Sequence, residues 1–238
     1  MNMNKYKHQI HGSIAHDSNV SALTTRELHE RVGGLSKPSK MPCHGYSIPA
    51  SRCFTGSKLR LKAGSTCAKC YALKGRYVFK NVQEALERRY RAMVYDLDAW
   101  TANMVHLIAR QEKTGFFRWH DSGDIQSTQH LHAIVRIALA LPSIKFWLPT
   151  RELKMVRKYL EIDGMFIPSN LRIRVSSYFV GSRMKLPDEL VDEGVTLSTV
   201  GFDDKRTYQC PANTQGNTCG ACRACWSAGK HVVNYPLH

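Results

Sequence analysis

Hydrophobic residues recur every three or four positions in several stretches of this chain, a spacing typical of amphipathic helices. The clearest stretch covers residues 77–96, and a second helix is expected from Asp98, as its N-cap, to a stop at Gly115. Later stretches of the same kind predict a helix from Ser127 that ends before Pro142, one from Thr150 that ends at Gly164, and one that Pro187 opens and Gly194 closes.

Short segments of β-branched and aromatic residues alternate with these helices. They predict strands over residues 45–50, 116–120, 144–148, 171–176 and 195–200. Helices between consecutive strands are typical of βαβ units and of a parallel sheet. Since the chain has no Gly-x-Gly-x-x-Gly turn, we do not expect a dinucleotide-binding sheet. We therefore predict an α/β fold, a partial (β/α) barrel with its chemistry at the carboxyl ends of the strands.

The chain divides into three parts by composition. Residues 1–40 are polar, with one short helix expected where Thr24 and Glu27 fit a capping box. Residues 41–205 hold the partial barrel, and residues 206–238 form a cysteine-rich, metal-binding tail as a C-terminal extension.

Hydropathy and charge limit the kinds of partner that this protein is expected to bind. No apolar run approaches the roughly 18 residues that a membrane-spanning helix needs, so no membrane partner is expected. The first residues are polar and carry no secretion signal, which predicts a cytoplasmic protein with reduced thiols. The formal net charge is +15, and such an excess favours polyanions, nucleic acid first. The alternative is an ordinary solvated basic surface.

Eight cysteines carry the most specific signal, because they lie in two groups near opposite ends of the chain. The first group is Cys43, Cys53, Cys67 and Cys70, and the second is Cys210, Cys219, Cys222 and Cys225. Thiolates separated by two residues converge easily on one soft metal centre, so Cys-x-x-Cys recurs in zinc and iron–sulfur sites. Metal ligation is favoured over disulfides in a chain that is neither short nor secreted.

Within the first group, Cys53, Cys67 and Cys70 follow the first predicted strand. Three cysteines there would hold three irons of a [4Fe–4S] cluster and leave the fourth iron open to a substrate or cofactor. The alternative is a zinc site completed by Cys43 or His44.

The second group has the spacing Cys210-x8-Cys219-x2-Cys222-x2-Cys225 and supplies four thiolates. Four thiolates suit a closed [4Fe–4S] cluster or a structural zinc ion. A tail stapled by disulfides is the remaining alternative.

A polar motif, His120-Asp-Ser-Gly-Asp124, follows the second predicted strand. Such a concentration of polar side chains at a strand end is costly unless they bind something. A carboxylate there would hold an amino group, and His120 would move a proton. The alternative is turn chemistry, in which Asp121 and Asp124 accept hydrogen bonds from the local backbone.

Longer motifs give the chain a resemblance to a known family. They are Ser47-Ile-Pro-Ala50, Cys67-Ala-Lys-Cys-Tyr-Ala-Leu-Lys-Gly75, Phe117-Arg-Trp-His-Asp-Ser-Gly-Asp124, Trp147-Leu-Pro-Thr-Arg-Glu152 and the tail from Cys210 to His238. In these motifs the chain resembles bacteriophage-encoded proteins of the gene-product-88 type, over roughly residues 35–238. The resemblance implies an iron–sulfur protein of the host cytosol, similar to radical S-adenosylmethionine enzymes.

The resemblance to radical S-adenosylmethionine enzymes implies roles for individual residues. Their Cys-x3-Cys-x2-Cys signature is stretched here to Cys53-x13-Cys67-x2-Cys70, and the tail is similar to their auxiliary-cluster extensions. His120–Asp124 stands in the place of their Gly-Gly-Glu-like motif, so a carboxylate of this motif would hold the methionine amino group. The implied catalytic residues are His120, Asp121 and Asp124, and the implied cofactor contacts are Tyr71, Asp121, Ser122, Asp124, Thr150 and Ser176.

The first hypothesis from the sequence is therefore a protein with one or two [4Fe–4S] clusters and radical S-adenosylmethionine activity, which would require an electron donor. One rival is a non-catalytic iron–sulfur redox or regulatory protein, whose first cluster a fourth protein ligand would close. The other rival is a zinc-stabilised nucleic-acid-binding protein.

Overall fold

The computed structural model describes residues 18–202 and 204–237. Its centre is a sheet of seven parallel strands in the order β1-β2-β3-β4-β5-β7-β6. The strands are β1 (Gly45–Tyr46), β2 (Phe116–Trp119), β3 (Lys145–Thr150), β4 (Leu171–Ser176), β5 (Thr196–Val200), β6 (Tyr208–Gln209) and β7 (Val232–Tyr235). The α/β class and the parallel sheet that the sequence predicts are confirmed.

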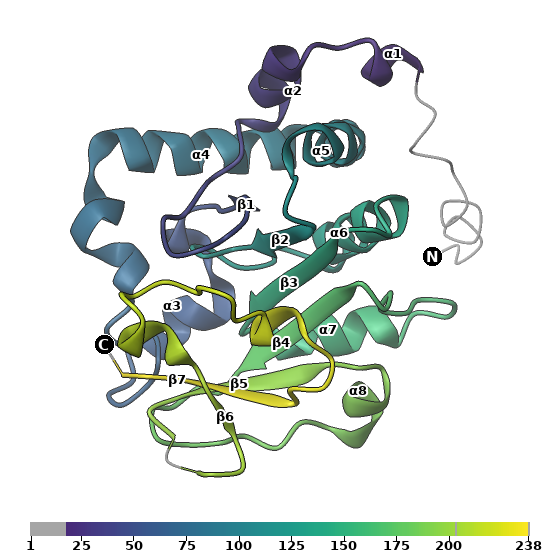
Figure 1. The fold of residues 1–238 in the computed structure, drawn as a ribbon. Coiled ribbons are helices and arrows are strands. Elements are labelled where there is room, and N and C mark those ends of the chain that lie inside the picture. The colour runs from purple at the N-terminus through teal and green to yellow at the C-terminus, as the bar shows by residue number, and fades with distance from the viewer. Residues whose placement is uncertain (1–17, 203, 238) are drawn as a thin grey trace.

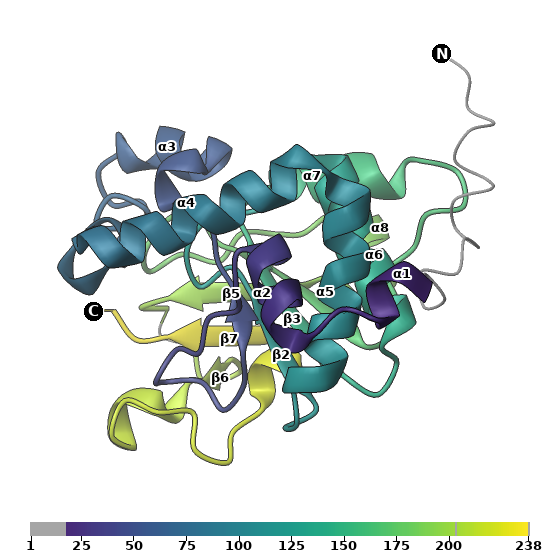
Figure 2. The same cartoon turned by 90° about the horizontal axis from the view of Figure 1, so that it is seen from above.

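Helices cover one face of this sheet, and the C-terminal tail covers the other (Figures 1 and 2). The helices are α1 (Ser18–Ser21), α2 (Thr25–Val32), α3 (Phe54–Arg60), α4 (Lys80–Tyr95), α5 (Leu97–Gln111), α6 (Thr128–Ala140), α7 (Leu153–Leu160) and α8 (Asp188–Asp192). In the described part of the chain, no helix combines the length and the apolar character needed to cross a membrane.

The two faces of the sheet differ in chemistry because successive side chains of a strand point to opposite sides. The helix-covered face belongs to one large apolar core, to which the strands contribute Phe117, Trp119, Phe146, Leu148, Ile173, Val175 and Leu197. On the tail-covered face the contacts involve Arg118, Trp147, Arg174, Ser198 and Tyr235. The tail-covered face therefore carries the arginine, serine and tyrosine side chains that the apolar core excludes.

The N-terminal helix confirms the prediction from its capping box. The Thr24 side chain accepts a hydrogen bond from the Glu27 backbone N–H, and the Glu27 side chain accepts one from the Thr24 backbone N–H. Gly33 ends α2 in the left-handed conformation, with φ of 78°. Leu28 and Val32 are fully buried, so this helix is anchored to the main core.

Several boundaries differ from the sequence prediction. Asp96, rather than Asp98, caps α5, because its carboxylate accepts a hydrogen bond from the Ala99 N–H. Strand β3 continues to Thr150, where pairing with Val175 of β4 keeps it extended, so α7 begins only at Leu153.

Helices α1 and α3 and strands β6 and β7 were not predicted. Helix α3 follows β1, in a stretch for which no helix was predicted. Strands β6 and β7 come from the tail, and β7 pairs with β5 through Leu197–Val232 to Val200–Tyr235. The tail thereby completes the sheet as well as carrying cysteines.

Candidate functional site

The first cysteine group lies on the segment that follows β1. Cys53 is the N-cap of α3, and Cys67 and Cys70 lie beyond the end of that helix. A Cβ atom placed on Gly56 would lie 3.7 Å from the Sγ atoms of both Cys53 and Cys67, so these sulfur atoms flank the glycine. Cys70 acts electrostatically on the thiols of both Cys53 and Cys67, so it lies in the same region of the molecule. The structure thus places Cys53 and Cys67 on either side of Gly56, and the convergence of all three cysteines on one metal stays a prediction.

Side chains from the carboxyl ends of β3 and β4 hold this segment. Glu152, just after β3, accepts hydrogen bonds of 2.7 Å from both the backbone N–H and the hydroxyl of Thr55. Arg151 donates from Nε to the Thr66 hydroxyl over 3.1 Å, and the Thr66 N–H donates to the Tyr178 carbonyl oxygen over 2.8 Å. The sequence predicted no role at the site for Thr55, Thr66, Arg151 or Glu152, although two of them end the Trp147–Glu152 motif.

Asp124 lies beside the first cysteine group and organises the end of β3. Its carboxylate accepts hydrogen bonds from the Thr150 hydroxyl at 2.6 Å, the Arg151 N–H at 2.8 Å and the Ile125 N–H at 2.8 Å. Burial raises the pKa of Asp124 to about 6, although the hydrogen bond from Thr150 acts in the opposite direction. Asp124 in turn raises the pKa of the Cys53 thiol, so the carboxylate and the cysteines share one electrostatic environment.

The thiols of Cys53 and Cys67 are disposed to stay protonated without a cation. Burial is the largest effect on Cys53 and Cys67, and it raises the pKa of each thiol above its usual range. The guanidinium of Arg151 acts in the opposite direction and lowers the pKa of both thiols. Thiolates at this site would therefore need a further positive charge, which a bound metal supplies.

Asp121 is held by a separate set of side chains. Its carboxylate accepts hydrogen bonds from the Ser47 and Tyr77 hydroxyls, and its backbone carbonyl accepts one from the Tyr71 hydroxyl. Asp121 is half-buried, whereas Asp124 is buried. Asp121 is thus the more accessible carboxylate of the two.

The remaining predicted residues occupy other surroundings. His120 has a positive φ of 50°, and its buried ring packs beside Trp119 and His130, with centroids 6.2 Å and 5.4 Å away. Burial, assisted by the charge of Arg118, lowers the pKa of His120 to about 3, so its imidazole is neutral. His120 was predicted to act together with Asp121 and Asp124, but neither ring nitrogen has a hydrogen-bond partner among the described residues.

Two serines that were predicted as cofactor contacts also lie in other surroundings. Ser122 is buried, and its hydroxyl has no hydrogen-bond partner among the described residues. The Ser176 hydroxyl lies 3.0 Å from that of Ser198 on the tail-covered face of the sheet. Of the predicted cofactor contacts, only Thr150 joins Asp124 directly, while Tyr71 binds the backbone of Asp121.

The second cysteine group lies in a small cluster between the tail and the sheet. This cluster contains buried Cys225, Trp147, Trp226 and Val233, with Cys210 and Cys222 packed against it. Two tyrosines from the sheet touch its sulfur atoms: the Tyr208 hydroxyl lies 3.2 Å from Cys222 Sγ, and the Tyr235 hydroxyl 3.2 Å from Cys225 Sγ. Burial raises the pKa of Cys225 to about 11.

Cys43 belongs to this second cluster and not to the first group. It is fully enclosed, and burial raises the pKa of its thiol to about 12, with an electrostatic contribution from Cys219. Cys43 precedes β1 whereas Cys53 follows it, so the strand carries the two residues to opposite ends. His44 Nδ1 lies 3.0 Å from a carboxylate oxygen of Glu112, so neither proposed fourth ligand stands beside the first group.

All eight cysteines are free thiols, which argues against a disulfide-stapled tail. Within residues 18–202 and 204–237, no three His, Cys, Asp or Glu side chains are already arranged as a metal-coordination shell. The thiols therefore share two environments without being drawn together as ligands.

Arg118 of β2 lies between the two environments, a relationship that no sequence motif indicates. Its guanidinium carbon lies 4.6 Å from the ring centroid of Trp147, and its charge acts on Asp121 and on Cys225. Burial would lower the pKa of Arg118, but its neighbours, Tyr71 and Asp121 first among them, raise it on balance.

Comparison with protein families gives one finding: a sequence model of the family described as gene product 88 matches residues 17–228. No curated protein and no solved structure matches the chain.

Proposed function

We propose that this chain, which belongs to the gene product 88 family, binds a [4Fe–4S] cluster through Cys53, Cys67 and Cys70 and uses it in radical S-adenosylmethionine chemistry. The observation that supports the proposal is the placement of the Cys53 and Cys67 sulfur atoms beside Gly56, where Cys70 and Asp124 both act electrostatically on Cys53. Three thiolates match three irons of such a cluster and leave one iron for a small molecule. We further propose that the sheet is the partial barrel of such enzymes.

The donor atoms at this site fit an iron–sulfur cluster. Thiolates are its usual protein ligands, and Gly56 leaves room beside two of the sulfur atoms where any side chain would intrude. The charge of Arg151 opposes the negative charge that thiolates bring. A bound cluster would supply one electron for reductive cleavage of S-adenosylmethionine.

The chain's own residues would bind and orient the small molecule. Asp124 uses its carboxylate to fix Thr150 and the backbone of Arg151, so we assign it a positioning role. Asp121 is half-buried and is the more accessible of the two carboxylates, and we assign it the methionine amino group. Arg118, next to Asp121, would suit the carboxylate of the same methionine moiety.

For the second group we propose a closed metal centre held by Cys210, Cys219, Cys222 and Cys225. Four thiolates need no additional ligand, and Tyr208 and Tyr235 would donate hydrogen bonds to two of the sulfur atoms. Such a centre would tie the tail to the sheet whichever metal it holds.

Anaerobic purification followed by iron, sulfide and zinc analysis tests the proposal. We expect about four irons and four sulfides for each cluster, with Cys67→Ala losing one cluster. Cys43→Ala is the control for the first cluster, because Cys43 lies in the second cysteine cluster and not in the first group, and we expect it to retain the first cluster. Reduced protein should then cleave S-adenosylmethionine to methionine and 5′-deoxyadenosine.

Two results would contradict the proposal in different ways. Full iron content in Cys67→Ala would show that Cys53, Cys67 and Cys70 do not hold a cluster. A complete first cluster without any cleavage of S-adenosylmethionine would leave a non-catalytic iron–sulfur protein. Asp121→Asn should lower cleavage while leaving iron content unchanged, which separates cofactor binding from cluster binding.

A further inference from the structure

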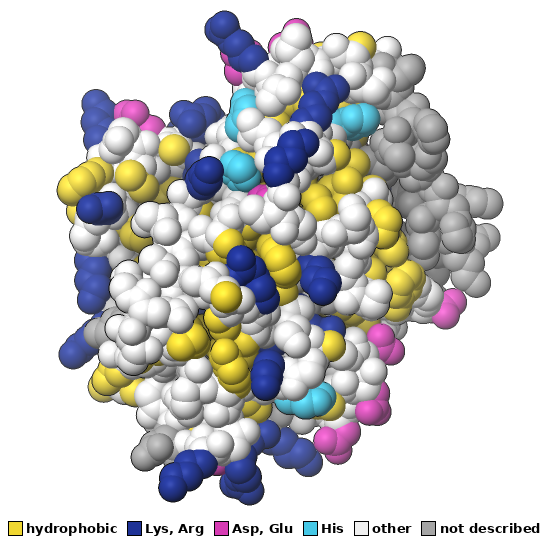
Figure 3. Space-filling view, viewed as in Figure 1, with side chains coloured by type: hydrophobic (Ala, Val, Ile, Leu, Met, Phe, Trp, Pro, Cys, Tyr) yellow, Lys and Arg dark blue, Asp and Glu magenta, His cyan; other side chains and the backbone are white. Residues whose placement is uncertain are grey.

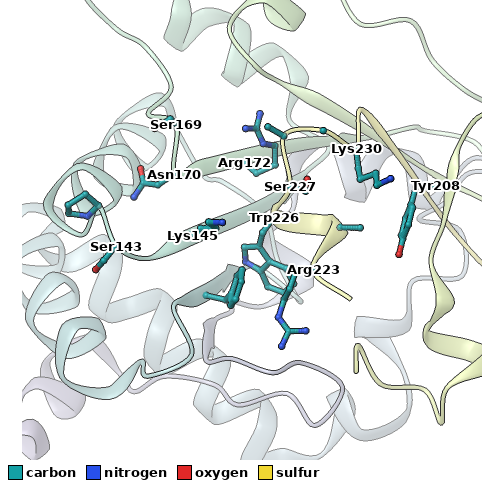
Figure 4. Close-up of a pocket in the computed structure, with 15 residues that line it drawn as sticks. Ser143, Lys145, Ser169, Asn170, Arg172, Tyr208, Arg223, Trp226, Ser227 and Lys230 are labelled. Atoms are coloured by element: carbon teal, nitrogen blue, oxygen red, sulfur yellow. The ribbon is translucent and has the colours of Figure 1, made fainter. Parts of the chain in front are cut away.

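A pocket with a volume of about 790 Å³ lies between the amino-terminal parts of β2, β3 and β4 and the tail segment 223–230. Pockets of roughly 300–1,000 Å³ commonly hold small molecules. Figure 4 shows its side chains, with Lys145 and Arg172 coming from the sheet and Arg223 and Lys230 from the tail. The pocket lies apart from the Cys53 segment, which follows the carboxyl end of β1.

The charge of this pocket is one-sided. Lys145, Arg172, Arg223 and Lys230 line it, and its lining contains neither Asp nor Glu. None of these four side chains takes part in an ion pair with a described residue. Figure 3 shows Lys and Arg side chains scattered over this face and its margins, with most of the acidic ones towards the margins. The pocket therefore offers four cations without a compensating charge in its lining.

Arg172 gives the pocket a buried donor. Only 9% of this residue is exposed, and one of its terminal nitrogen atoms donates to the Gly194 carbonyl oxygen. Its Nε atom is buried and has no hydrogen-bond partner among the described residues. Burial lowers the pKa of this guanidinium, because its charge is poorly solvated. A bound anion would stabilise that charge. Buried unpaired donors are costly, which favours a ligand that accepts from them.

Aromatic rings orient two of the other cations. The guanidinium carbon of Arg223 lies 5.2 Å from the ring centroid of Phe116, and Lys230 Nζ lies 5.0 Å from that of Tyr208. These contacts restrict where the two side chains can go.

The tail wall of the pocket is fixed to the sheet. The Trp226 indole N–H donates to the Phe117 carbonyl oxygen over 2.9 Å, and Arg174 donates to the carbonyl oxygens of Ala224 and Ser227 over 2.9 Å and 3.0 Å. The wall and its cations are therefore held in place before any ligand arrives, which lowers the entropic cost of binding.

We propose that this pocket binds the phosphate groups of a nucleotide or of a nucleic-acid strand. Phosphate oxygens accept several charge-assisted hydrogen bonds at once, and lysine and arginine are the side chains that supply them. The size of the pocket suits one nucleotide-sized group. The proposal does not depend on radical chemistry, since none of its residues belongs to the first cysteine group.

The test measures binding of pyrophosphate, ATP and a fluorescent single-stranded oligothymidylate to the metal-loaded full chain. The variant Lys145→Gln/Lys230→Gln removes two exposed lysines of the pocket. Lys154→Gln/Lys158→Gln removes the same charge from exposed positions on α7 and is the matched control. We expect the pocket variant to bind about tenfold more weakly or worse, and the control to bind almost as well as the native chain.

Each outcome is decisive. Binding of pyrophosphate and ATP without the oligonucleotide identifies a free nucleotide as the ligand, and oligonucleotide binding that pyrophosphate displaces identifies a nucleic-acid strand. Absence of binding by all three probes overturns the proposal. So does an equal loss in both double variants, because that would reflect net charge alone. Iron content, measured in parallel, separates this result from failure of the cluster assignment.

Discussion

The side chain of Arg174 donates a hydrogen bond of 3.1 Å from its Nε atom to the backbone carbonyl oxygen of Cys225. Its other nitrogen atoms donate to the carbonyl oxygens of Ala224, Ser227 and Leu197. Arg174 is fully buried and has no ion-pair partner among the described residues. A guanidinium in β4 therefore fixes the backbone around the last cysteine and the tail wall of the basic pocket.

Arg174→Lys should destabilise the protein strongly. Lysine keeps the buried charge but cannot reproduce a planar set of donors aimed at four carbonyl oxygens. We expect a loss of about 3 kcal/mol or more in the free energy of unfolding, measured by urea denaturation of the metal-free protein. Arg157→Lys, at an exposed position, is the control and should change it by less than about 0.5 kcal/mol. Similar values for both variants would show that the four hydrogen bonds contribute little.

Thr24→Ala should weaken the N-terminal helix. It removes the hydroxyl that accepts from the Glu27 N–H over 3.2 Å, one half of the capping box. We expect a loss of about 1 kcal/mol in the free energy of unfolding, because Leu28 and Val32 couple this helix to the core. Thr25→Ala alters the next residue and leaves the capping box intact, so it should show no such loss. Equal effects from the two variants would count against the cap.

The capping box was predictable because its signal lies within four consecutive residues. Strand β7 was not, because its place depends on partners far along the chain. Its central residue is polar: the Asn234 side chain accepts from the Thr199 hydroxyl over 2.8 Å and donates to the Gln209 side chain over 2.6 Å. A buried asparagine that joins three separate segments gives no periodic pattern in the sequence.

The candidate site was predictable to the extent that it rests on local spacing. The spacing of Cys53, Cys67 and Cys70 indicated one shared location, and the sulfur atoms of Cys53 and Cys67 do lie beside the same glycine, Gly56. Cys43 was assigned to them because it is near Cys53 in sequence, but the intervening strand separates the two in space. Arg118 could not be recognised, because its role depends on segments that only the fold brings together.

Gly56→Ala should impair the first metal site without weakening the fold. Gly56 lies within α3 and has an ordinary helical backbone, so alanine would favour the helix by about 1 kcal/mol. The added methyl group would lie 3.0 Å from the Cys53 Cβ and 3.7 Å from both sulfur atoms. We expect iron at the first site to fall by at least about half, measured after anaerobic purification, because the methyl group would displace the Cys53 Cβ and would fill the space beside both sulfur atoms.

Gly229→Ala is the control for this prediction. A Cβ at Gly229 would meet only the Ser227 hydroxyl, at 3.8 Å, and it lies in the tail segment away from α3. Its iron content should equal that of the native chain. If Gly56→Ala also keeps all of its iron while remaining folded, the cluster does not occupy the space beside this glycine.

Asp124 should give the folded protein a recognisable dependence on pH. Its pKa is raised from an ordinary value of 3.8 to about 6, so between these values the folded state binds more protons than the unfolded state. The resulting stabilisation is present in full below pH 3.8 and is lost as the pH rises through 6. Asp124→Asn cannot titrate, and its amide nitrogen cannot accept the hydrogen bond that Arg151 donates.

Urea denaturation of the native chain and of Asp124→Asn at pH values between about 4 and 7 tests this direction of change. Both proteins are used metal-free, because metal binding itself depends on pH. The difference between the unfolding free energies of the native chain and the variant should fall by about 1–3 kcal/mol as the pH rises. Because the variant also lacks the bond from Arg151, a constant difference should remain at neutral pH. A difference that does not vary with pH would mean that Asp124 keeps an ordinary pKa, and its carboxylate would then be solvated rather than enclosed with Cys53 at the end of β3.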